Sequence, residues 1–458
     1  MNENVSDHRK RSFFQKVLWE YPHEREVLKG LRLCGKSVLH TPFNVSSVHI
    51  LSNGKESKLW GTLTCRSAWA CPYCSARVMA DKGTKIACAI DALSTWYQQS
   101  AMMLTFTLPH TKDMSAKETF SLLKATWRLF SKICKQKSVS RINKAGEKVF
   151  RGNNIWGKFR EDLEIEHWVK VYEFTWGENS WHPHIHALFW TPNDLLQKAK
   201  YYEADLNEFW WHCAKHEAKK YYAKKYASVD KANQIINSLF ADYKKAHPCI
   251  TISKDKKGNV KKQKSAHYIS GWGGDSELTG SERPKYAKEG HYTPHAILEQ
   301  AYSLRDKPEE AKPWIDLYIE YCMATFRVRR VEFSKRSKES LNEIIERWKK
   351  SEGFMTIYKK KCMEAGKWKT VVWFTENQWS DILYKEHETG DFIVSMILQL
   401  ASSRRFSIES RTFKILDFLL SNYDINCYEN INGSDFCNHM WEKSQWVEEQ
   451  LFDNQIPA

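Results

Sequence analysis

The chain has 458 residues, which is enough for two or three domains with a well-buried core. Its 70 lysines and arginines outnumber its 55 aspartates and glutamates, and the net charge of +15 favours a polyanionic partner such as nucleic acid. No run approaches the roughly 20 apolar residues that span a bilayer, and the N-terminus lacks the apolar core of a signal peptide, so we expect a cytoplasmic protein with no membrane partner.

Residues 1–33 are polar and charged, and they are expected to form a poorly ordered arm or a first helix. Residues 34–98 are predicted to form a small cysteine-rich, zinc-binding region. Cys71 and Cys74 present two thiols from one tight turn, and Cys65 lies six residues upstream of this pair. Such spacing is typical of structural Zn²⁺ sites, which are closed and leave no position for water.

The fourth zinc ligand is the least defined by the sequence. Cys34 is the natural candidate, and His40 and His49 compete with it. A redox-active Cys-x-x-Cys pair and incidental buried thiols are the alternatives to a metal site. A disulfide framework is disfavoured in a cytoplasmic protein.

Residues 99–335 carry the main predicted domain. Alternating apolar residues predict strands, and apolar residues repeating with a period of 3.6 predict helices. These patterns give helices at residues 79–98 and 117–135, strands at 103–109 and 248–252, a basic loop or hairpin at 139–158 and a lysine-rich turn at 254–259. Residues 194–247 are predicted to be a helical insertion. Residues 336–458 are predicted to form a mainly helical domain that binds DNA or a partner, with one strand at residues 370–374.

The most informative segment is residues 181–190, where His184 and His186 flank Ile185 in a strand-like run. Side chains alternate between the faces of a strand, so the two histidines point the same way, on the order of 7 Å apart. Ile185 then points into the core. Two imidazoles held in this way can bind one divalent cation. A third histidine, His182, favours a metal site over a surface pair of histidines.

A short polar turn at residues 177–180 joins the preceding strand to the histidine strand, which predicts a β-hairpin. If Trp176 faces Trp181, Glu173 lies opposite His184, and a two-residue slip places it opposite the next histidine. Two nitrogens, one oxygen and open positions suit Mn²⁺ or Mg²⁺ acting as a Lewis acid on phosphate. The alternative is that Glu173 is a solvated strand carboxylate.

A metal that polarises a phosphodiester still needs an attacking group, and water and a tyrosine hydroxyl are the two options. Tyr268 follows a basic run, within a helix predicted over residues 264–272. Most tyrosines in such surroundings are core residues, so the local pattern leaves Tyr268 as one candidate among 20.

The order of these segments resembles that of the rolling-circle replication initiators of small plasmids and phages, which are HUH endonucleases. The resemblance extends roughly over residues 34–335, and the cysteines resemble the front end of one plasmid family in this group. The segments that carry it are Cys65, Cys71 and Cys74, residues 104–110, the Glu173 strand, residues 182–186, residues 268–272, residues 272–279 and residues 292–294.

The resemblance implies an α+β fold, in which a ferredoxin-like antiparallel sheet with helices follows the cysteine-rich region and precedes the helical C-terminal region. It implies that His184 and His186 bind a catalytic Mn²⁺ or Mg²⁺ ion, completed by Glu173 or His182. Tyr268 would attack a phosphodiester of origin DNA that is locally single-stranded or in a hairpin. The protein would then be joined to the 5′-phosphate, and the free 3′-hydroxyl would prime a host DNA polymerase, with a host helicase as a further partner.

Two positions depart from the family pattern. Many initiators carry a second tyrosine one helical turn after the first, where this chain has Trp272. Some single-tyrosine relatives carry an acid one turn before the tyrosine, where this chain has Lys264. The route by which the covalent adduct is resolved therefore stays open. Trp272, Lys264 and the neighbouring Lys261 and Lys262 are candidate DNA-binding residues, and a core role is the alternative for Trp272.

Other functions fit parts of the same pattern. A single-strand transposase or a conjugative relaxase of the HUH type uses the same nicking and joining chemistry, although large relaxases usually place the tyrosine near the N-terminus. A metal-dependent hydrolase would use water in place of Tyr268. A zinc-containing DNA-binding regulator would have no enzymatic activity.

Overall fold

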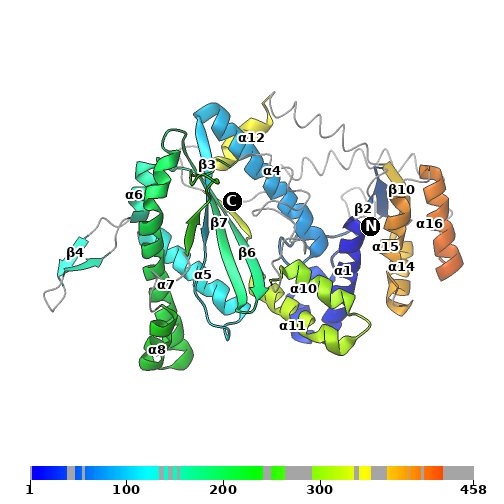
Figure 1. The fold of residues 1–458 in the computed structure, drawn as a ribbon. Helices are drawn as coiled ribbons and strands as arrows, with labels where there is room; N and C mark the ends of the chain where they lie inside the picture. The colour runs from blue at the N-terminus through cyan, green and yellow to red at the C-terminus, as the bar shows by residue number, and fades with distance from the viewer. Residues whose placement is uncertain are drawn as a thin grey trace. The chain divides into compact units, whose positions relative to one another are not determined.

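A computed structural model shows an α+β protein in which antiparallel sheets are covered by helices (Figure 1). The structure describes residues 3–38, 47–53, 57–133, 139–142, 148–151, 155–240, 249–263, 291–334, 340–351, 369–389, 391–403 and 407–425. Within these ranges, none of the helices combines the length and apolar character needed to cross a bilayer.

The chain divides into two compact units. The cysteine unit comprises residues 1–67, 71–75 and 356–458, and the histidine unit comprises residues 68–70 and 76–355. Each unit is named after the cluster of side chains that it holds. The cysteine unit joins N-terminal and C-terminal segments that the sequence analysis assigns to separate domains, because strands from the two segments pair with each other.

The histidine unit is built on an antiparallel sheet of five described strands in the order β8-β3-β7-β6-β9. The strands are β3 (Gln99–Phe106), β6 (Trp168–Gly177), β7 (Ser180–Pro192), β8 (Ile250–Ile252) and β9 (Val331–Phe333). The predicted strands are therefore confirmed, although β3 begins and ends earlier than the range 103–109. The histidine strand β7 lies at the centre of the sheet, between β3 and β6.

Helices follow or precede these strands along the chain. They are α4 (Pro72–Tyr97), α5 (Ala116–Ile133), α6 (Ile155–Asp162), η2 (Leu196–Tyr202), α7 (Glu203–Tyr226), α8 (Val229–Leu239), α10 (Pro294–Ser303), α11 (Pro308–Thr325) and α12 (Leu341–Lys349). The predicted basic hairpin is present as β4 (Val139–Ile142) and β5 (Lys148–Arg151). The predicted helical insertion is present as η2, α7 and α8.

One face of the sheet packs against an aromatic layer. Phe106 of β3 lies 5.1 Å, between ring centroids, from both Trp127 of α5 and Trp210 of α7. Phe174 of β6 lies 4.8 Å from Phe120 of α5. Each fully buried ring contributes about 1.5–3 kcal/mol through burial, and edge-to-face pairs add about 1 kcal/mol. Many of the aromatic side chains of this chain therefore stabilise the core.

The opposite face is apolar at only one end. There Val169, Leu188 and Trp190 are buried against α4 and α12. The alternation of side chains along β7 places His182, His184 and His186 further along this same face.

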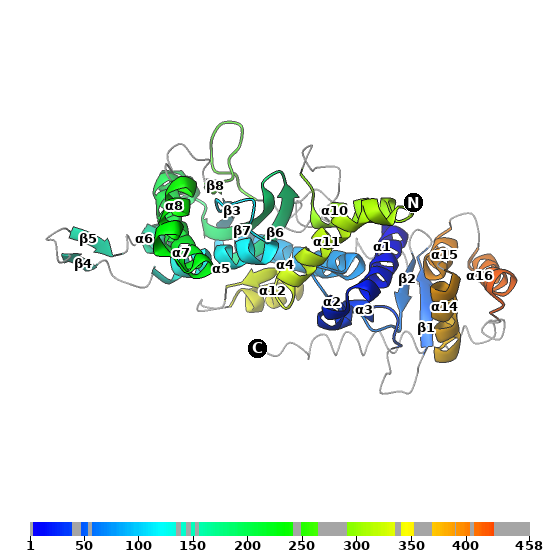
Figure 2. The same ribbon diagram turned by 90° about the horizontal axis from the view of Figure 1, so that it is seen from below.

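The cysteine unit contains an antiparallel sheet in the order β10-β1-β2. Its strands are β1 (Ser47–Ser52), β2 (Ser57–Trp60) and β10 (Lys369–Thr375), and β10 confirms the strand predicted at residues 370–374. Figure 2 shows α14 (Glu376–Thr389), α15 (Ile393–Ala401) and α16 (Ile408–Tyr423) lying against this sheet.

The N-terminal segment of the cysteine unit is helical rather than a poorly ordered arm. It forms α1 (Glu3–Val17), η1 (Leu18–Glu20), α2 (Pro22–Val27) and α3 (Lys29–Arg32). On α1, Ser12 donates a hydrogen bond of 2.6 Å to Glu386 of α14. Gln15 donates hydrogen bonds to the carbonyls of Leu31 and Cys34, at 2.8 and 2.9 Å. These bonds connect α1 to the C-terminal helices and to the first cysteine.

Two glycines with positive φ provide a test of this packing. Gly61 has φ +85°, and a Cβ there would lie 2.1 Å from the carbonyl oxygen of Ser47, whereas Gly258 has φ +79° and open space around it. We expect Gly61→Ala to lower the free energy of unfolding by about 3 kcal/mol or more, because left-handed strain adds to a backbone clash. Gly258→Ala should cost only about 1 kcal/mol. Urea unfolding of both variants measures this, and equal losses would contradict the packing.

Candidate functional site

The β6–β7 hairpin adopts the first of the two predicted registers. Trp176 pairs with Trp181 across the turn, and Glu173 pairs with His184. Thr175 pairs with His182 in the same ladder. The prediction that Glu173 and the histidines share a face is therefore confirmed.

The three histidines form a row on this face. The ring centroids of His182 and His184 are 4.4 Å apart, and those of His184 and His186 are 6.0 Å apart, with the latter two rings nearly parallel. Ile185 is fully buried on the opposite face, as predicted. His110, from the loop after β3, extends the row, because its ring centroid lies 5.0 Å from that of His182.

His186 is the best-anchored member of the row. It is only 6% exposed, and its Nε2 donates a 2.7 Å hydrogen bond to Oε2 of Glu173. Its Nδ1 lies 3.0 Å from the hydroxyl of Thr105, its partner in β3. Burial alone would raise the pKa of Glu173, but the hydrogen bond and the charge of His186 lower it below its usual value. Glu173 is thus an ionised, hydrogen-bonded carboxylate rather than a solvated one.

The other two histidines are neutral at physiological pH. Burial lowers the pKa of His184 to about 4 and that of His182 to about 3. Neutral imidazole is the form that binds metal ions. Among the described residues, Nδ1 of His184 has no hydrogen-bond partner although it is buried. Such an atom is costly unless a ligand satisfies it.

The side chains present are compatible with a divalent cation. Adjacent ligands of an octahedral Mg²⁺ ion lie about 3 Å apart, because each bond is about 2.1 Å long. The 2.7 Å between His186 and Glu173 is close to this separation. The ligand atoms of the histidine row are nevertheless more widely spaced than those of the cysteines. In the part of the chain that the structure describes, only the cysteine cluster has three or more ligand atoms within 4.8 Å of one another.

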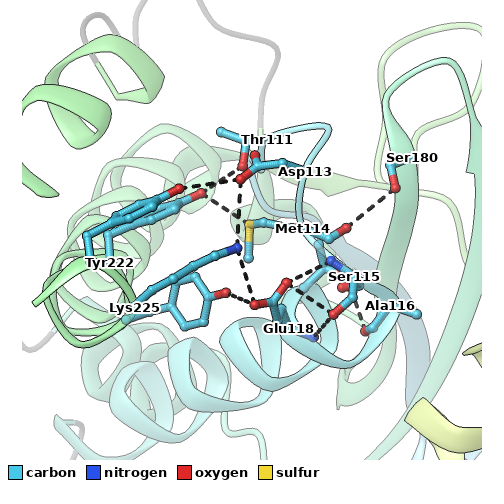
Figure 3. Close-up of polar contacts among 12 residues, drawn as sticks. Thr111, Asp113, Met114, Ser115, Ala116, Glu118, Ser180, Tyr222 and Lys225 are labelled. Atoms are coloured by element: carbon cyan, nitrogen blue, oxygen red, sulfur yellow. Dashed lines mark hydrogen bonds and ion pairs between the residues drawn. The ribbon is translucent and has the colours of Figure 1, made fainter. Parts of the chain in front are cut away.

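The loop that carries His110 is held by a polar network (Figure 3). Tyr222 and Lys225 of α7 point toward this loop. The hydroxyl of Tyr222 lies 3.0 Å from that of Thr111, and Lys225 forms ion pairs with Asp113 at 3.7 Å and with Glu118 at 3.3 Å. These contacts hold the loop, and the ring of His110 itself lies against the backbone, with Nδ1 3.2 Å from the carbonyl of Leu108 and Nε2 3.0 Å from that of Asn179.

Three of the predicted site residues, Tyr268, Trp272 and Lys264, lie outside the described residues. Lys261 and Lys262 are described, and both are exposed. They follow the lysine-rich turn, which is present at the predicted position, after β8.

The four predicted cysteines come together, and Cys34 is the fourth member. The four Sγ atoms lie within 4.8 Å of one another. Cys34 Sγ is 3.8 Å from Cys71 Sγ and 3.5 Å from Cys74 Sγ, and no described cysteine forms a disulfide. The backbone amide of Cys65 donates to Cys34 Sγ at 3.4 Å.

The competing histidines do not change this assignment. His49 lies in β1, where its Nε2 is 2.9 Å from the hydroxyl of Ser47 and its ring meets the edge of Trp60. It belongs to the core of the cysteine unit. His40 lies outside the described residues.

Arg11 of α1 is a site residue that the sequence analysis missed. It is buried, and its guanidinium fills the space above Gly35, where a Cβ would lie 2.5 Å from Nη1. Burial alone would lower its pKa, but the negative charge of Cys34 and its neighbours raises it. Hydrogen bonds with the other thiols, Cys65 first, lower the pKa of Cys34. The hydrogen bond with Cys34 raises the pKa of Cys65, and burial raises the pKa of Cys71, so the negative charge of the cluster lies on only part of its thiols, beside the buried cation of Arg11.

No protein-family model, curated protein or solved structure matches the chain.

Proposed function

We propose that the protein is a metal-dependent DNA nickase and strand transferase that initiates rolling-circle replication, with the fold and chemistry of an HUH endonuclease. The observation that carries the proposal is the row of His182, His184 and His186 beside Glu173 on the two central strands of an antiparallel sheet. Its substrate would be origin DNA that is locally single-stranded or in a hairpin. The net charge of +15 suits this polyanionic substrate.

In this proposal His184, His186 and Glu173 hold a divalent cation, Mn²⁺ or Mg²⁺, and His182 completes the set. The cation would stabilise charge on the non-bridging oxygens of the phosphate. Nε2 of His186, which donates to Glu173 in this structure, would give up its proton to become a ligand, and Thr105 would then orient the ring from Nδ1, 3.0 Å from its hydroxyl.

Tyr268 is the proposed nucleophile. Its oxygen forms a bond with phosphorus and loses its proton, while the bond from phosphorus to the 3′-oxygen breaks and that oxygen takes up a proton. The products are a 5′-phosphotyrosine and a free 3′-hydroxyl, which a host polymerase extends after a host helicase opens the duplex. The joined ends conserve the energy of the phosphodiester, so the strand can be resealed.

The anchors on either side of Tyr268 are compatible with this role. The amide of Gln263 donates to the carbonyl of Ala101 at 2.8 Å, and Tyr292 exchanges two backbone hydrogen bonds with Trp176 beside the histidine row. Ala101 lies four residues, or about 13 Å, from Thr105 on β3. The five residues from Gln263 to Tyr268 can span about 17 Å. An extended segment is therefore long enough to bring the phenol to the histidines, whereas the helix predicted over residues 264–272 would span only about 8 Å between Gln263 and Tyr268.

The cysteine cluster is proposed to hold a structural Zn²⁺ ion. Four thiolates leave no open position for water, so the ion would stabilise the fold and take no part in cleavage. Its ligands come from three places in the chain, namely the end of α3, the segment after β2 and the first turn of α4.

Nicking is tested with single-stranded oligonucleotides that tile the DNA flanking the gene, incubated with Mn²⁺ and then denatured. Strands labelled at the 3′ end should give a protein-linked band, and strands labelled at the 5′ end should give a shorter product that a polymerase extends. Tyr268→Phe should abolish both products. The double variant His184→Ala with His186→Ala should reduce cleavage by at least about 10³-fold, because the charge-stabilising cation is lost. Tyr384→Phe, an exposed tyrosine of α14, is the matched control.

The other functions give different results in the same assay. Cleavage without a covalent band would indicate a hydrolase that uses water. Binding without cleavage by the wild-type protein would indicate a DNA-binding regulator. Either result would overturn the nickase proposal.

Zinc content is measured by elemental analysis of the purified protein, with one Zn²⁺ per chain expected. Cys71→Ser should lose the ion and several kcal/mol of stability, since binding of a structural metal contributes directly to folding. Cys213→Ser, which changes a buried cysteine outside the cluster, should retain the ion. A wild-type protein without metal would contradict the zinc assignment.

Arg11 should raise the affinity of the cluster for Zn²⁺, because four thiolates around one Zn²⁺ ion leave a net negative charge in a buried site. We expect Arg11→Gln to weaken zinc binding about tenfold, the lower end of the effect of residues that surround metal ligands. Competition with a chromogenic chelator measures the affinity. Arg9→Gln is the control, since Arg9 lies on the same helix and bonds to Gln399 instead. Equal zinc affinities in the two variants would show that Arg11 has no such role.

A further inference from the structure

The segment after β8 forms a rigid, strongly basic hairpin, residues 250–263, which we call the lysine hairpin. Oδ1 of Asp255 accepts hydrogen bonds from the amides of Lys257 and Asn259, at 2.8 and 2.9 Å, and Lys254 pairs with Val260. Because these bonds fix the turn, its charged side chains project from a defined platform. The exposed lysines are Lys254, Lys256, Lys257, Lys261 and Lys262.

Two clamps join the lysine hairpin to the start of the helical insertion. The side chain of Gln197 bonds to both the amide and the carbonyl of Val260, at 2.9 and 3.1 Å. Oε1 of Glu203 accepts a 2.9 Å hydrogen bond from the amide of Ile252. Tyr201 lies between these two clamps in the sequence, so its backbone is within four residues of both contacts with the lysine hairpin.

Tyr201 is unusually exposed for an aromatic residue. Its exposed fraction is 72%, the highest among the large hydrophobic side chains that the structure describes. Nζ of Lys200 lies 5.1 Å from its ring centroid. Burial in the core does not account for this ring. An exposed ring beside a cation is the kind of surface on which bases of single-stranded nucleic acid stack.

The lysine hairpin begins two strands away from His186, the nearest member of the histidine row. Thr251 pairs with Thr105, which pairs in turn with His186, so the three residues lie in one line across the sheet. Lys254 lies three residues after Thr251 in the chain, or about 10 Å from it. A strand with a phosphate at His186 would therefore reach the hairpin within a few nucleotides.

The charges of this surface suit a phosphate backbone. The two carboxylates on this surface already have partners within it. Asp255 accepts hydrogen bonds from amides of the turn, and Glu203 forms an ion pair with Lys254. The remaining lysines are available to phosphates, and each phosphate that they neutralise releases counterions.

We propose that the lysine hairpin and Tyr201 bind single-stranded DNA that extends from the histidine row, with a base stacked on Tyr201 and phosphates on the lysines. One part of this proposal rests on the proposed function, namely that the bound strand is DNA and continues to the histidine row. The exposure of Tyr201, the charge of the lysines and the two clamps support the binding surface independently.

The test is fluorescence anisotropy with a labelled 20-nucleotide oligo-dT and the full-length protein, without added Mn²⁺ or Mg²⁺. Tyr201→Ala should weaken binding about tenfold, the loss expected for one stacked base, with an unchanged salt dependence. Tyr201→Phe keeps the ring and should bind within about twofold of the wild type. Thermal unfolding of both variants should match the wild type, because the side chain is exposed.

The lysines are tested by a quadruple variant that combines Lys256→Gln, Lys257→Gln, Lys261→Gln and Lys262→Gln. The slope of log Kd against log salt should fall by about 0.7 for each phosphate that the variant no longer neutralises. A control variant removes the same charge from four exposed lysines elsewhere, namely Lys307, Lys312, Lys350 and Lys414. This control should leave the slope close to that of the wild type.

Three outcomes would overturn the proposal. The first is that both Tyr201→Ala and the quadruple variant bind oligo-dT with wild-type affinity. The second is that the control variant loses as much affinity for oligo-dT as the quadruple variant does. The third is that Tyr201→Ala loses as much affinity for a labelled DNA duplex as it loses for oligo-dT. The binding readout is independent of cleavage. If the wild type does not nick DNA but Tyr201→Ala loses oligo-dT binding, the surface stands and the nickase proposal fails. If the wild type nicks DNA but Tyr201→Ala and the quadruple variant bind oligo-dT normally, the nickase proposal stands and the proposed binding surface fails.

Discussion

The pairing of Trp176 with Trp181 is the constraint on which the histidine row depends. Only two residues separate the paired ends of β6 and β7, so the register is set close to the site. In this register the face that carries His184 also carries Glu173. A slip by one residue would turn every side chain of β7 to the other face, bringing the histidines into the aromatic layer and exposing Ile185.

The position of the row along its face explains its electrostatics. Leu188 and Trp190 continue the same face into the apolar core, so the histidines lie at the margin of that core. Burial there keeps His184 neutral, whereas Glu173 stays ionised because His186 donates to it. A site that holds neutral nitrogens beside a charged oxygen is prepared for a cation without a large desolvation cost.

Features set by local pattern were accessible from the sequence. Alternation and the short turn were sufficient to predict the hairpin and the shared face of Glu173 and the histidines, but they left two registers open, and cysteine spacing predicted the thiol cluster. Interactions between distant segments were not accessible. Arg11 meets Cys34 only through the packing of α1, and Thr105 meets His186 only through the order of strands in the sheet. The pairing of β1 with β10 likewise has no local signal.

That last pairing has a consequence for biosynthesis. The chain between Ser52 and Lys369 takes on the order of half a minute to translate at ~5–20 residues per second. Throughout this time β1, whose six residues are all buried in the finished fold, lacks the strand that covers one of its edges. A strand with an unpaired edge can pair with other chains, so the nascent protein is exposed to aggregation throughout this time. A premature stop anywhere between β2 and β10 would leave the β1–β2 pair without the third strand of its sheet, rather than merely shorten the protein at its end.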